Sequence, residues 1–198
     1  MIFARATNNA KKLKEIDRIL ASLGHSIKSL KELGVDVNPE ENGETFADNA
    51  LIKAKVVAEI ANLPTISDDS GLCVDRLGGA PGVHTARYAG ENATDDENID
   101  KLLNRLENLP DSDRGAAFVS SVCLYMPEKS QDNYVICTGE CRGYIARERQ
   151  GEGGFGYDPV FMVDGKSYAS MSRREKDAIS HRGAALRLLA EKIAKIYK

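Results

Sequence analysis

The stretch Leu63-Pro64-Thr65-Ile66-Ser67-Asp68-Asp69-Ser70-Gly71 is the point around which the rest of the chain is organised. Its first four residues are typical of a buried strand, whereas two carboxylates, a hydroxyl and a glycine follow. Because adjacent side chains of a strand point to opposite faces, Asp68 and Asp69 cannot both face solvent if the strand is central. We therefore expect at least one of them at a strand end facing a cleft, where a carboxylate could bind Mg²⁺ or deprotonate water. A turn is the alternative, since Asp-Asp-Ser-Gly has good turn chemistry.

The composition indicates a globular protein with a sizeable core. The chain has 198 residues, of which 42% are hydrophobic and 29% charged, which suits one large domain or two intimate lobes. A formal net charge of -3 argues against a general nucleic-acid binder, which would usually carry a basic stripe. No signal-peptide pattern and no run of membrane-spanning length is found, and four scattered cysteines indicate reduced, mostly buried thiols. We expect a cytoplasmic protein that binds neither a nucleic acid polymer nor a membrane.

A strand, a polar loop and a helix are predicted at the beginning of the chain. Residues 2–6 are strand-like, and from Leu13 to Leu23 apolar residues recur at helical spacing until Gly24. The intervening residues 7–12 read Thr-Asn-Asn-Ala-Lys-Lys. Such a junction directs backbone N–H groups and a helix N-terminus at one point, which suits an anion. An Asn-capped helix without a ligand is the alternative.

A second helix is predicted to begin at Thr45 or Asp48 and to run to about Ala61. It is rich in alanine and apolar on two faces, so we expect it to be sandwiched between layers. Asn49 and Lys53 are four residues apart and share one side of it. That side is either solvated, or it faces a cleft in which Lys53 binds phosphate.

The second half of the chain predicts long strands and two more helices. Residues 116–126, 133–141 and 142–147 are β-type runs, and the turn over 127–132 indicates a hairpin in a mixed sheet. Thr94 and Glu97 match a capping box at the start of a helix.

The terminal helix begins with two cationic side chains, His181 and Arg182. Cations at a helix N-terminus oppose the macrodipole, so these two indicate a role outside the helix, such as binding a negatively polarised ligand group.

A glycine-rich loop precedes the last predicted strand. Its glycines over residues 151–156 match G-x-G-x-x-G, but Pro159 and an apolar strand over 160–163 follow. A dinucleotide site needs a helix there, so we reject that interpretation. An exposed backbone that presents Phe155 suits a nucleobase pocket, and a structural turn with Phe155 in the core is the alternative.

Several blocks in order along the chain resemble the inosine triphosphate pyrophosphatase family, which removes deaminated purine nucleoside triphosphates. The blocks span residues 6–12, 44–50, 67–72, 78–88, 153–159 and 175–182. Each block is weak by itself, whereas six in the same order are specific. One departure lies in the first loop, which in the family usually reads Thr-Gly-Asn-x-Gly-Lys. Here Asn8 and Lys11 stand where the family has glycine.

The resemblance implies an elongated α/β fold of two lobes, formed by a single domain over residues 1–198. A long central mixed β-sheet would be flanked by helices, with an active-site cleft between the lobes. It further implies a homodimer, a required Mg²⁺, and hydrolysis of XTP, ITP or dITP to the monophosphate and pyrophosphate. The alternatives are a pyrophosphatase with another base preference and a non-catalytic nucleotide-binding or RNA-binding module.

The resemblance also implies a role for each matching residue. Asp69 would be the general base, and the metal would lie near Asp69 and Glu40 or Glu41. The residues that would hold the phosphates are Thr7, Asn8, Asn9, Ala10, Lys11, Lys12, Lys53 and Ser70. The residues that would hold the base are Phe155, which stacks on it, with Gly156, Tyr157, Asp158, Lys176, His181 and Arg182.

Overall fold

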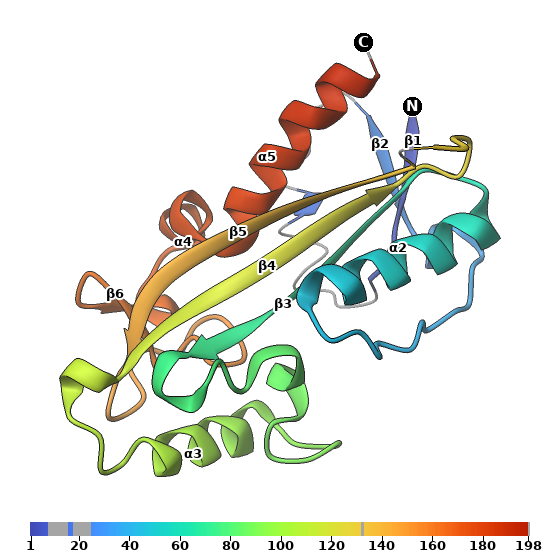
Figure 1. Ribbon diagram of the computed structural model, residues 1–198. Coiled ribbons are helices and arrows are strands. Elements are labelled where there is room, and N and C mark those ends of the chain that lie inside the picture. Colours follow the sequence, from blue (N-terminus) through green and yellow to red (C-terminus); the bar gives the residue numbers. More distant parts are fainter. Residues whose placement is uncertain (8–15, 18–24, 132, 198) are drawn as a thin grey trace. The chain divides into compact units, whose positions relative to one another are not determined.

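A computed structural model describes residues 1–7, 16–17, 25–131 and 133–197 of the chain. This part of the chain forms one seven-stranded sheet with the strand order β2-β1-β3-β4-β5-β6-β7 (Figure 1). The strands are β1 (Ile2–Arg5), β2 (Ser26–Ser29), β3 (Thr65–Val74), β4 (Gly115–Tyr125), β5 (Tyr134–Ile145), β6 (Phe161–Val163) and β7 (Lys166–Ser167). The helices are α2 (Phe46–Ala61), α3 (Asp95–Arg105), α4 (Arg173–Ile179) and α5 (His181–Ile196). Because β1 is parallel to β2 and β3 while β6 is antiparallel to β5 and β7, the sheet is mixed, and the predicted fold class is confirmed.

The chain divides into two compact units. Unit 1 consists of Met1–Asp69, Ser120–Gly139 and His181–Lys198, and unit 2 consists of Ser70–Val119 and Glu140–Ser180. Two of the passages from one unit to the other fall at Asp69–Ser70 and at Ser180–His181, inside stretches that the sequence singled out. The organisation of residues 1–198 as a single domain stays a prediction.

In unit 1, helices cover both faces of the sheet. Along β4, Val122 and Leu124 belong to the apolar cluster that contains α5, whereas Cys123 and Tyr125 belong to the cluster that contains α2. This alternation is what the two-residue period of a strand requires. Figure 1 shows α2 and α5 on different sides of β4. Val57 of α2 packs with residues of the β1 region, but Ile60, on the second apolar face that the sequence predicted, is 56% exposed, so the predicted sandwiching of this helix is not confirmed.

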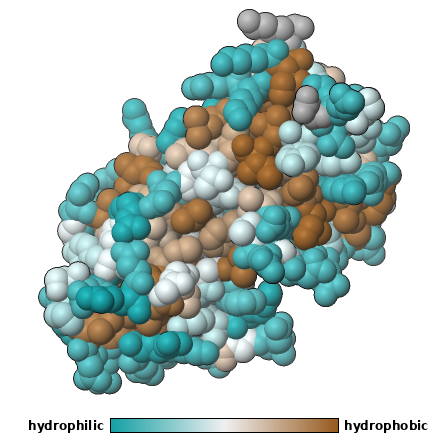
Figure 2. All heavy atoms as spheres, in the orientation of Figure 1, coloured by the Kyte–Doolittle hydropathy of each residue, from teal (hydrophilic) through white to brown (hydrophobic). Residues whose placement is uncertain are grey.

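In unit 2, α3 supplies the apolar stripe that closes the core. Ile99, Leu102 and Leu106 are buried together with side chains from β3, β4 and β5. Burying each such side chain stabilises the fold by about 1.5–3 kcal/mol relative to leaving it exposed. The predicted capping box of Thr94 and Glu97 is present at the start of the helix. The outer surface of α3 is hydrophilic in Figure 2, which fits an amphipathic helix at the surface.

Two predicted boundaries were wrong. Asp68 and Asp69 lie inside β3, which continues to Val74, so these carboxylates are neither in a turn nor at a strand end. The two strands predicted over 133–141 and 142–147 are one strand, β5. The short helix α4 was not predicted, whereas the predicted start of the terminal helix at His181 is confirmed. Likewise, α2 begins after Thr45 as expected, with a capping box. None of the helices in the described residues has the length and apolar character needed to cross a bilayer.

We expect Arg114→Met to lower the free energy of unfolding by about 2–4 kcal/mol. Arg114 is buried, and its guanidinium donates to the carbonyl oxygens of Leu106 at 2.6 Å, Ile145 at 2.7 Å and Ala146 at 2.7 Å. Methionine fills similar space but leaves these carbonyls without that donor. Urea denaturation measures the loss. Arg147→Met is the matched control: Arg147 is exposed and pairs with Asp111, so its loss should cost below about 1 kcal/mol. Equal losses of unfolding free energy in the two variants would contradict the conclusion that the buried hydrogen bonds of Arg114 stabilise the fold.

Candidate active site

Asp68 and Asp69 lie on opposite faces of β3, as the strand period predicted. Oδ2 of Asp68 accepts a hydrogen bond from Nε of Arg182 at 3.0 Å, on the face covered by α5. On the face covered by α2, Asp69 accepts from Nδ2 of Asn49 at 3.2 Å and from Nζ of Lys53 at 3.4 Å. The two adjacent carboxylates therefore have different partners: Arg182 for Asp68, and Asn49 with Lys53 for Asp69.

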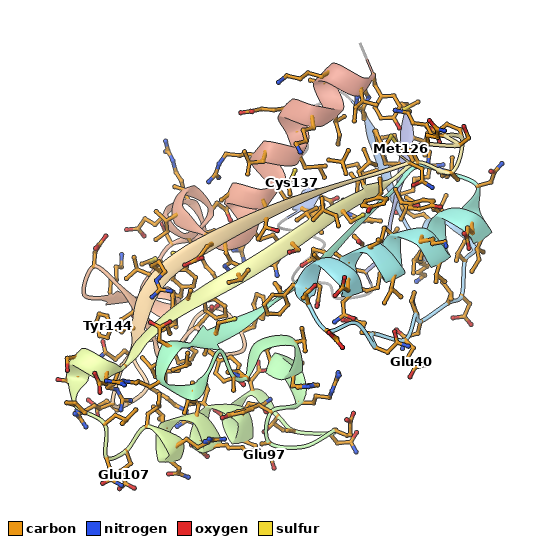
Figure 3. The ribbon with its side chains drawn as sticks, viewed as in Figure 1. Glu40, Glu97, Glu107, Met126, Cys137 and Tyr144 are labelled. Carbon is orange, nitrogen blue, oxygen red and sulfur yellow. The ribbon has the colours of Figure 1, made fainter. Side chains whose placement is uncertain are left out.

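Lys53 lies between two carboxylates. Its Nζ atom is 3.0 Å from Oε1 of Glu41 and 3.4 Å from Oδ1 of Asp69. The side chains of Lys53 and Asp69 are 9% and 10% exposed, whereas that of Glu41 is 38% exposed. The interpretation of this side of α2 as a solvated face is therefore wrong. Glu40 lies on the same loop before α2 (Figure 3) and is exposed, but it is Glu41 that reaches Lys53.

The amide of Asn49 is oriented by the loop before α2. Its Oδ1 atom accepts a hydrogen bond from the backbone N–H of Gly43 at 2.8 Å. With the oxygen committed to that donor, the NH₂ group faces Asp69 and donates to it. The carboxylate of Asp69 is thus held by an amide on one oxygen and an ammonium on the other, which leaves its position well defined.

We expect Gly43→Ala to disturb this arrangement. A Cβ atom at Gly43 would lie 2.6 Å from Cβ of Asp48 and 2.8 Å from Oδ1 of Asn49, so the loop or the start of α2 would have to move. The expected cost is about 1–3 kcal/mol in unfolding free energy, because small-to-large changes in a packed site force such shifts. Thermal unfolding is the measurement, and the midpoint should fall because Asn49 and the start of α2 are displaced. Asn42→Ala, at an exposed neighbouring position, is the control, and an equal fall in both variants would contradict this account.

Arg182 and Asp68 form a buried ion pair in unit 1. Their side chains are 3% and 0% exposed. Arg182 lies in the first turn of α5, where a cation opposes the helix macrodipole, and the carboxylate of Asp68 offsets that effect. The predicted role of Arg182 outside its helix is therefore at least this pairing. His181, the preceding residue, is buried as well.

A second group of polar and aromatic side chains lies in unit 2. Asp158 is 3% exposed and accepts a hydrogen bond from the backbone N–H of Phe155 at 2.9 Å. It also forms an ion pair with Lys176. Nζ of Lys176 lies 5.1 Å from the ring centroid of Phe155 and 5.0 Å from that of Tyr168, which are cation–π distances. Phe155 is half-buried, so the glycine-rich loop does not bury it completely in the core.

Two anchors hold the residues next to Phe155. The hydroxyl of Tyr157 donates to the carbonyl oxygen of Thr85 at 2.9 Å, and the N–H of Gly156 donates to Oδ2 of Asp95 at 2.8 Å. Burial raises the pKa of Tyr157, so its phenol stays protonated and acts as a donor near neutral pH. The loop is therefore tied to α3 and to the 3₁₀ helix over Gly82–Arg87.

The thiols are poor candidates for a nucleophile. Cys123, Cys137 and Cys141 are buried, as expected, while Cys73 is half-buried, and all four are free. Burial raises the pKa of Cys123 to about 12 and raises the pKa of the other three as well. Because the thiolate is the reactive form, these groups are unreactive near neutral pH. Figure 3 shows Cys137 on β5 in unit 1, on the strand that pairs at its far end with β6.

The predicted site residues fall into two groups, one in each unit. Those in unit 1 are Thr7, Glu40, Glu41, Lys53, Asp69, His181 and Arg182. Those in unit 2 are Ser70, Phe155, Gly156, Tyr157, Asp158 and Lys176. The predicted loop residues Asn8, Asn9, Ala10, Lys11 and Lys12 lie outside the described residues. The structure brings Lys53 and Glu41 together with Asp69, and Phe155 and Lys176 together with Asp158.

Sequence reasoning gave no site role to Asn49, Asp68 or Thr85, although each contacts a predicted residue. The spacing of Asn49 and Lys53 was a usable signal, because residues four apart share one helix side. The alternation along β3 likewise placed Asp68 opposite Asp69 without identifying its partner. No pattern in the sequence indicated Thr85.

Comparisons with known proteins place these features in a family. A family model described as Ham1 family matches residues 3–192. The chain is 49% identical to the dITP/XTP pyrophosphatase of Escherichia coli O157:H7 over 188 residues, which is 94% of each protein. It is similar in structure to a HAM1 protein from Coxiella burnetii, with a TM-score of 0.90, 42% identity and coverage of 98% and 99% of the two chains. A nucleoside-triphosphatase / dITP/XTP pyrophosphatase from Mycobacterium abscessus superposes with a TM-score of 0.78 and 43% identity, covering 96% and 98%.

Proposed function

The chain belongs to the Ham1 family, and we infer from this membership that it is a hydrolase acting on deaminated purine nucleoside triphosphates. Its substrates would be XTP, ITP and dITP, and its products the nucleoside monophosphate and pyrophosphate. The observation that carries the inference to this chain's own residues is Asp69. This buried carboxylate lies on β3 and is fixed by the amide of Asn49 and the ammonium of Lys53.

Charge is the first obstacle to this reaction. A nucleoside triphosphate carries about four negative charges near neutral pH, and attack on its anhydride needs that charge screened and a water molecule aligned. Lys53 supplies one cation at Asp69. We propose that Thr7 and the loop residues up to Lys12, together with Ser70, hold the phosphates with backbone N–H groups, hydroxyls and a second ammonium.

The group around Lys53 fits a divalent cation. Asp69 and Glu41 are hard oxygen donors, and they share one ammonium, so the three groups together keep one negative charge. Mg²⁺ is usually held by one or two carboxylates, several waters and substrate phosphates, so two protein carboxylates suffice. Within the described part of the chain no group of three or more His, Cys, Asp or Glu side chains that could hold a metal ion is found. We propose Asp69 and Glu41 as the ligands of Mg²⁺, which when bound would screen the phosphates and polarise the anhydride.

Proton transfer falls to Asp69. In the proposed reaction a water oxygen bonds to a phosphorus of the α–β anhydride, the bridging P–O bond breaks, and pyrophosphate or the monophosphate leaves. The proton of the water passes to a carboxylate oxygen of Asp69. Asn49 contacts one oxygen of that carboxylate and Lys53 the other, which keeps the carboxylate in one orientation for the proton transfer.

The group in unit 2 is proposed to bind the base. Phe155 would stack on the purine, and Asp158 and Lys176 would contact its polar edge, together with His181 and Arg182 of α5. An arginine side chain can only donate hydrogen bonds. It can therefore donate to the oxygen of a 6-oxo purine, whereas the amino group of adenine would place one donor against another. Each mismatch costs about 1–3 kcal/mol, because a buried donor is left without an acceptor.

We also propose that the protein is a cytoplasmic homodimer. The support is the family resemblance, together with four free thiols of the kind found in reducing compartments. Light scattering coupled to size-exclusion chromatography at micromolar concentration tests the dimer. A single monomeric species would contradict it.

One experiment tests the proposed function. The protein is incubated with Mg²⁺ and, in separate reactions, ITP, dITP, XTP, ATP and GTP, and the products are identified. Monophosphate plus pyrophosphate from the first three, with ATP and GTP largely intact, is the expected result. Diphosphate plus phosphate would contradict the cleavage site, and preferred release from a modified pyrimidine would assign another base preference. Tight RNA binding without hydrolysis of any triphosphate would make the protein a binding module.

A further inference from the structure

Thr85 makes two hydrogen bonds of different kinds. Its hydroxyl oxygen accepts from the backbone N–H of Leu72 at 3.1 Å. Its carbonyl oxygen accepts from the phenol of Tyr157 at 2.9 Å. All three residues belong to unit 2, and they are far apart in the sequence. A single residue therefore contacts both the strand that carries the acidic pair and the loop that carries Phe155.

The contact at Leu72 lies on a defined edge of β3. In the described residues the pairing of β3 with β1 extends to Ile66, and residues 66, 68, 70 and 72 of an extended strand direct their backbone groups to the same edge. Farther along that edge the N–H of Val74 donates to the carbonyl oxygen of Ala80 at 3.1 Å. The hydroxyl of Thr85 thus stands in for a strand partner at Leu72, three residues beyond Asp69, and holds this part of β3 extended.

Thr85 is itself held in place. The next residue, Ala86, accepts a hydrogen bond at its carbonyl oxygen from Nδ2 of Asn98 at 3.1 Å. Oδ1 of the same amide accepts from the N–H of Ala89 at 2.7 Å. Asn98 is 2% exposed and lies on α3, so this buried amide holds Ala86 inside the 3₁₀ helix that carries Thr85 and Ala89 just beyond the end of that helix. Because Thr85 is held in place, it can keep its two partners, Leu72 and Tyr157, at constant positions relative to each other.

The contact at Tyr157 reaches the loop from inside the core. Tyr157 is 3% exposed and belongs to the main apolar cluster of unit 2. It lies between the half-buried Phe155 and the buried Asp158. Because a buried ring has little freedom, its hydroxyl bond fixes where the backbone of these neighbours lies.

We propose that Thr85 is a positioning residue that links β3 to the base-binding loop. This inference rests on the proposed function, since it takes Phe155 and Asp158 as the residues that bind the purine. Thr85 does not touch the reacting atoms in this account. Within unit 2 it sets where Phe155 and Asp158 lie relative to Leu72 of β3, and so how steadily the base is held while the triphosphate reacts.

The first test compares substitutions at Thr85. Thr85→Val removes the hydroxyl but keeps the carbonyl, and we expect kcat for ITP to fall about three- to tenfold, the factor that one hydrogen bond of ordinary strength represents. KM should change less than about twofold, because the base still binds. Thr85→Ser keeps the hydroxyl and should retain wild-type kinetics. Thr138→Val is the matched control: it removes a threonine hydroxyl that bonds Ser121 at 2.9 Å in unit 1, and kcat should not change.

The second test asks whether the two bonds act as one link. Tyr157→Phe removes the hydrogen bond between Tyr157 and Thr85. If the two bonds act together, kcat of the double variant with Thr85→Val should lie within about twofold of kcat of the slower single variant. Hydrogen exchange measured by mass spectrometry gives a readout independent of turnover. The backbone amides of residues 153–158 should exchange at least about threefold faster in Thr85→Val than in wild type. In Thr138→Val their exchange rates should equal those of wild type.

The outcomes separate the two claims. If wild type fails to hydrolyse the nucleotide panel, the proposed function fails, while the exchange measurement still tests whether Thr85 restrains the loop. If wild type is active but Thr85→Val keeps its kcat and its exchange rates, the positioning role is overturned. A lower melting temperature with unchanged kcat at 25 °C would make Thr85 structural only. Effects of the two single variants that multiply in the double variant would show two separate contacts, which also overturns the link.

Discussion

Asp69→Asn is expected to lower ITP turnover by about 10²–10⁴-fold while the protein remains folded, because a positioned general base contributes a factor of that size. Asparagine keeps an oxygen that can accept from Asn49, so the geometry of β3 should persist. Lys53 would lose one carboxylate but keep Glu41 at 3.0 Å, so no buried ammonium is left without a counter-ion. What is lost is the negative charge of the carboxylate, and with it the proton acceptor for the attacking water and one of the two proposed Mg²⁺ ligands.

Pyrophosphate release at saturating ITP and Mg²⁺ measures the effect, and thermal unfolding checks the fold. Asp36→Asn removes an exposed carboxylate from the same unit and should leave turnover unchanged. Near-normal pyrophosphate release from the Asp69→Asn protein would refute the assigned role. A collapse of the melting temperature would instead mean that the Asn49 and Lys53 contacts stabilise the fold more than they serve the chemistry.

The acidic stretch shows which features of the candidate site could be predicted from the sequence and which could not. The strand period placed Asp68 and Asp69 on opposite faces, because alternation is a local property of an extended chain. The turn chemistry of Asp-Asp-Ser-Gly was overridden, since Asn49 and Lys53 from α2 and Arg182 from α5 supply partners to both carboxylates. Those partners come from elsewhere in the fold, so local propensity could not reveal that this stretch remains a strand.

In helix α2, too, some features could be predicted from the sequence and others could not. Its start was predictable, because a capping box is formed by residues three positions apart. The common side of Asn49 and Lys53 was predictable from their spacing. Whether that side was solvated or buried was not, because the answer depends on β3 and on the loop that contains Glu41.

The break predicted within β5 failed for a related reason. The predicted break divides this stretch into two β-type runs between Cys141 and Arg142. In the structure a Cβ at Gly143 would lie 2.2 Å from the carbonyl oxygen of Met162, so the glycine allows β6 to approach rather than ending the strand. The family, in contrast, was recognised correctly from six collinear blocks, because order along the chain needs no knowledge of packing.

Arg182→Ala is expected to have two separable effects. The first is on stability: it removes one partner of a pair whose side chains are 3% and 0% exposed and leaves the carboxylate of Asp68 buried without Arg182. Breaking a buried ion pair in this way costs about 3–5 kcal/mol. The second is on selectivity. If Arg182 donates to the 6-oxo group, its loss should narrow the ITP-over-ATP ratio of kcat/KM by about tenfold or more, because one mismatch with adenine is relieved.

A companion set of variants separates the two effects. Asp68→Asn weakens the pair but keeps the guanidinium, so it should lose stability and retain selectivity. The double variant Asp68→Asn with Arg182→Met removes both charges, so it should recover part of the unfolding free energy and still lack selectivity. Urea denaturation and initial rates with ITP and ATP give both quantities on the same proteins. An unchanged ITP-over-ATP ratio in both variants that lack Arg182 would restrict this arginine to holding Asp68, and His181 or Lys176 would then be the proposed donor to the 6-oxo group.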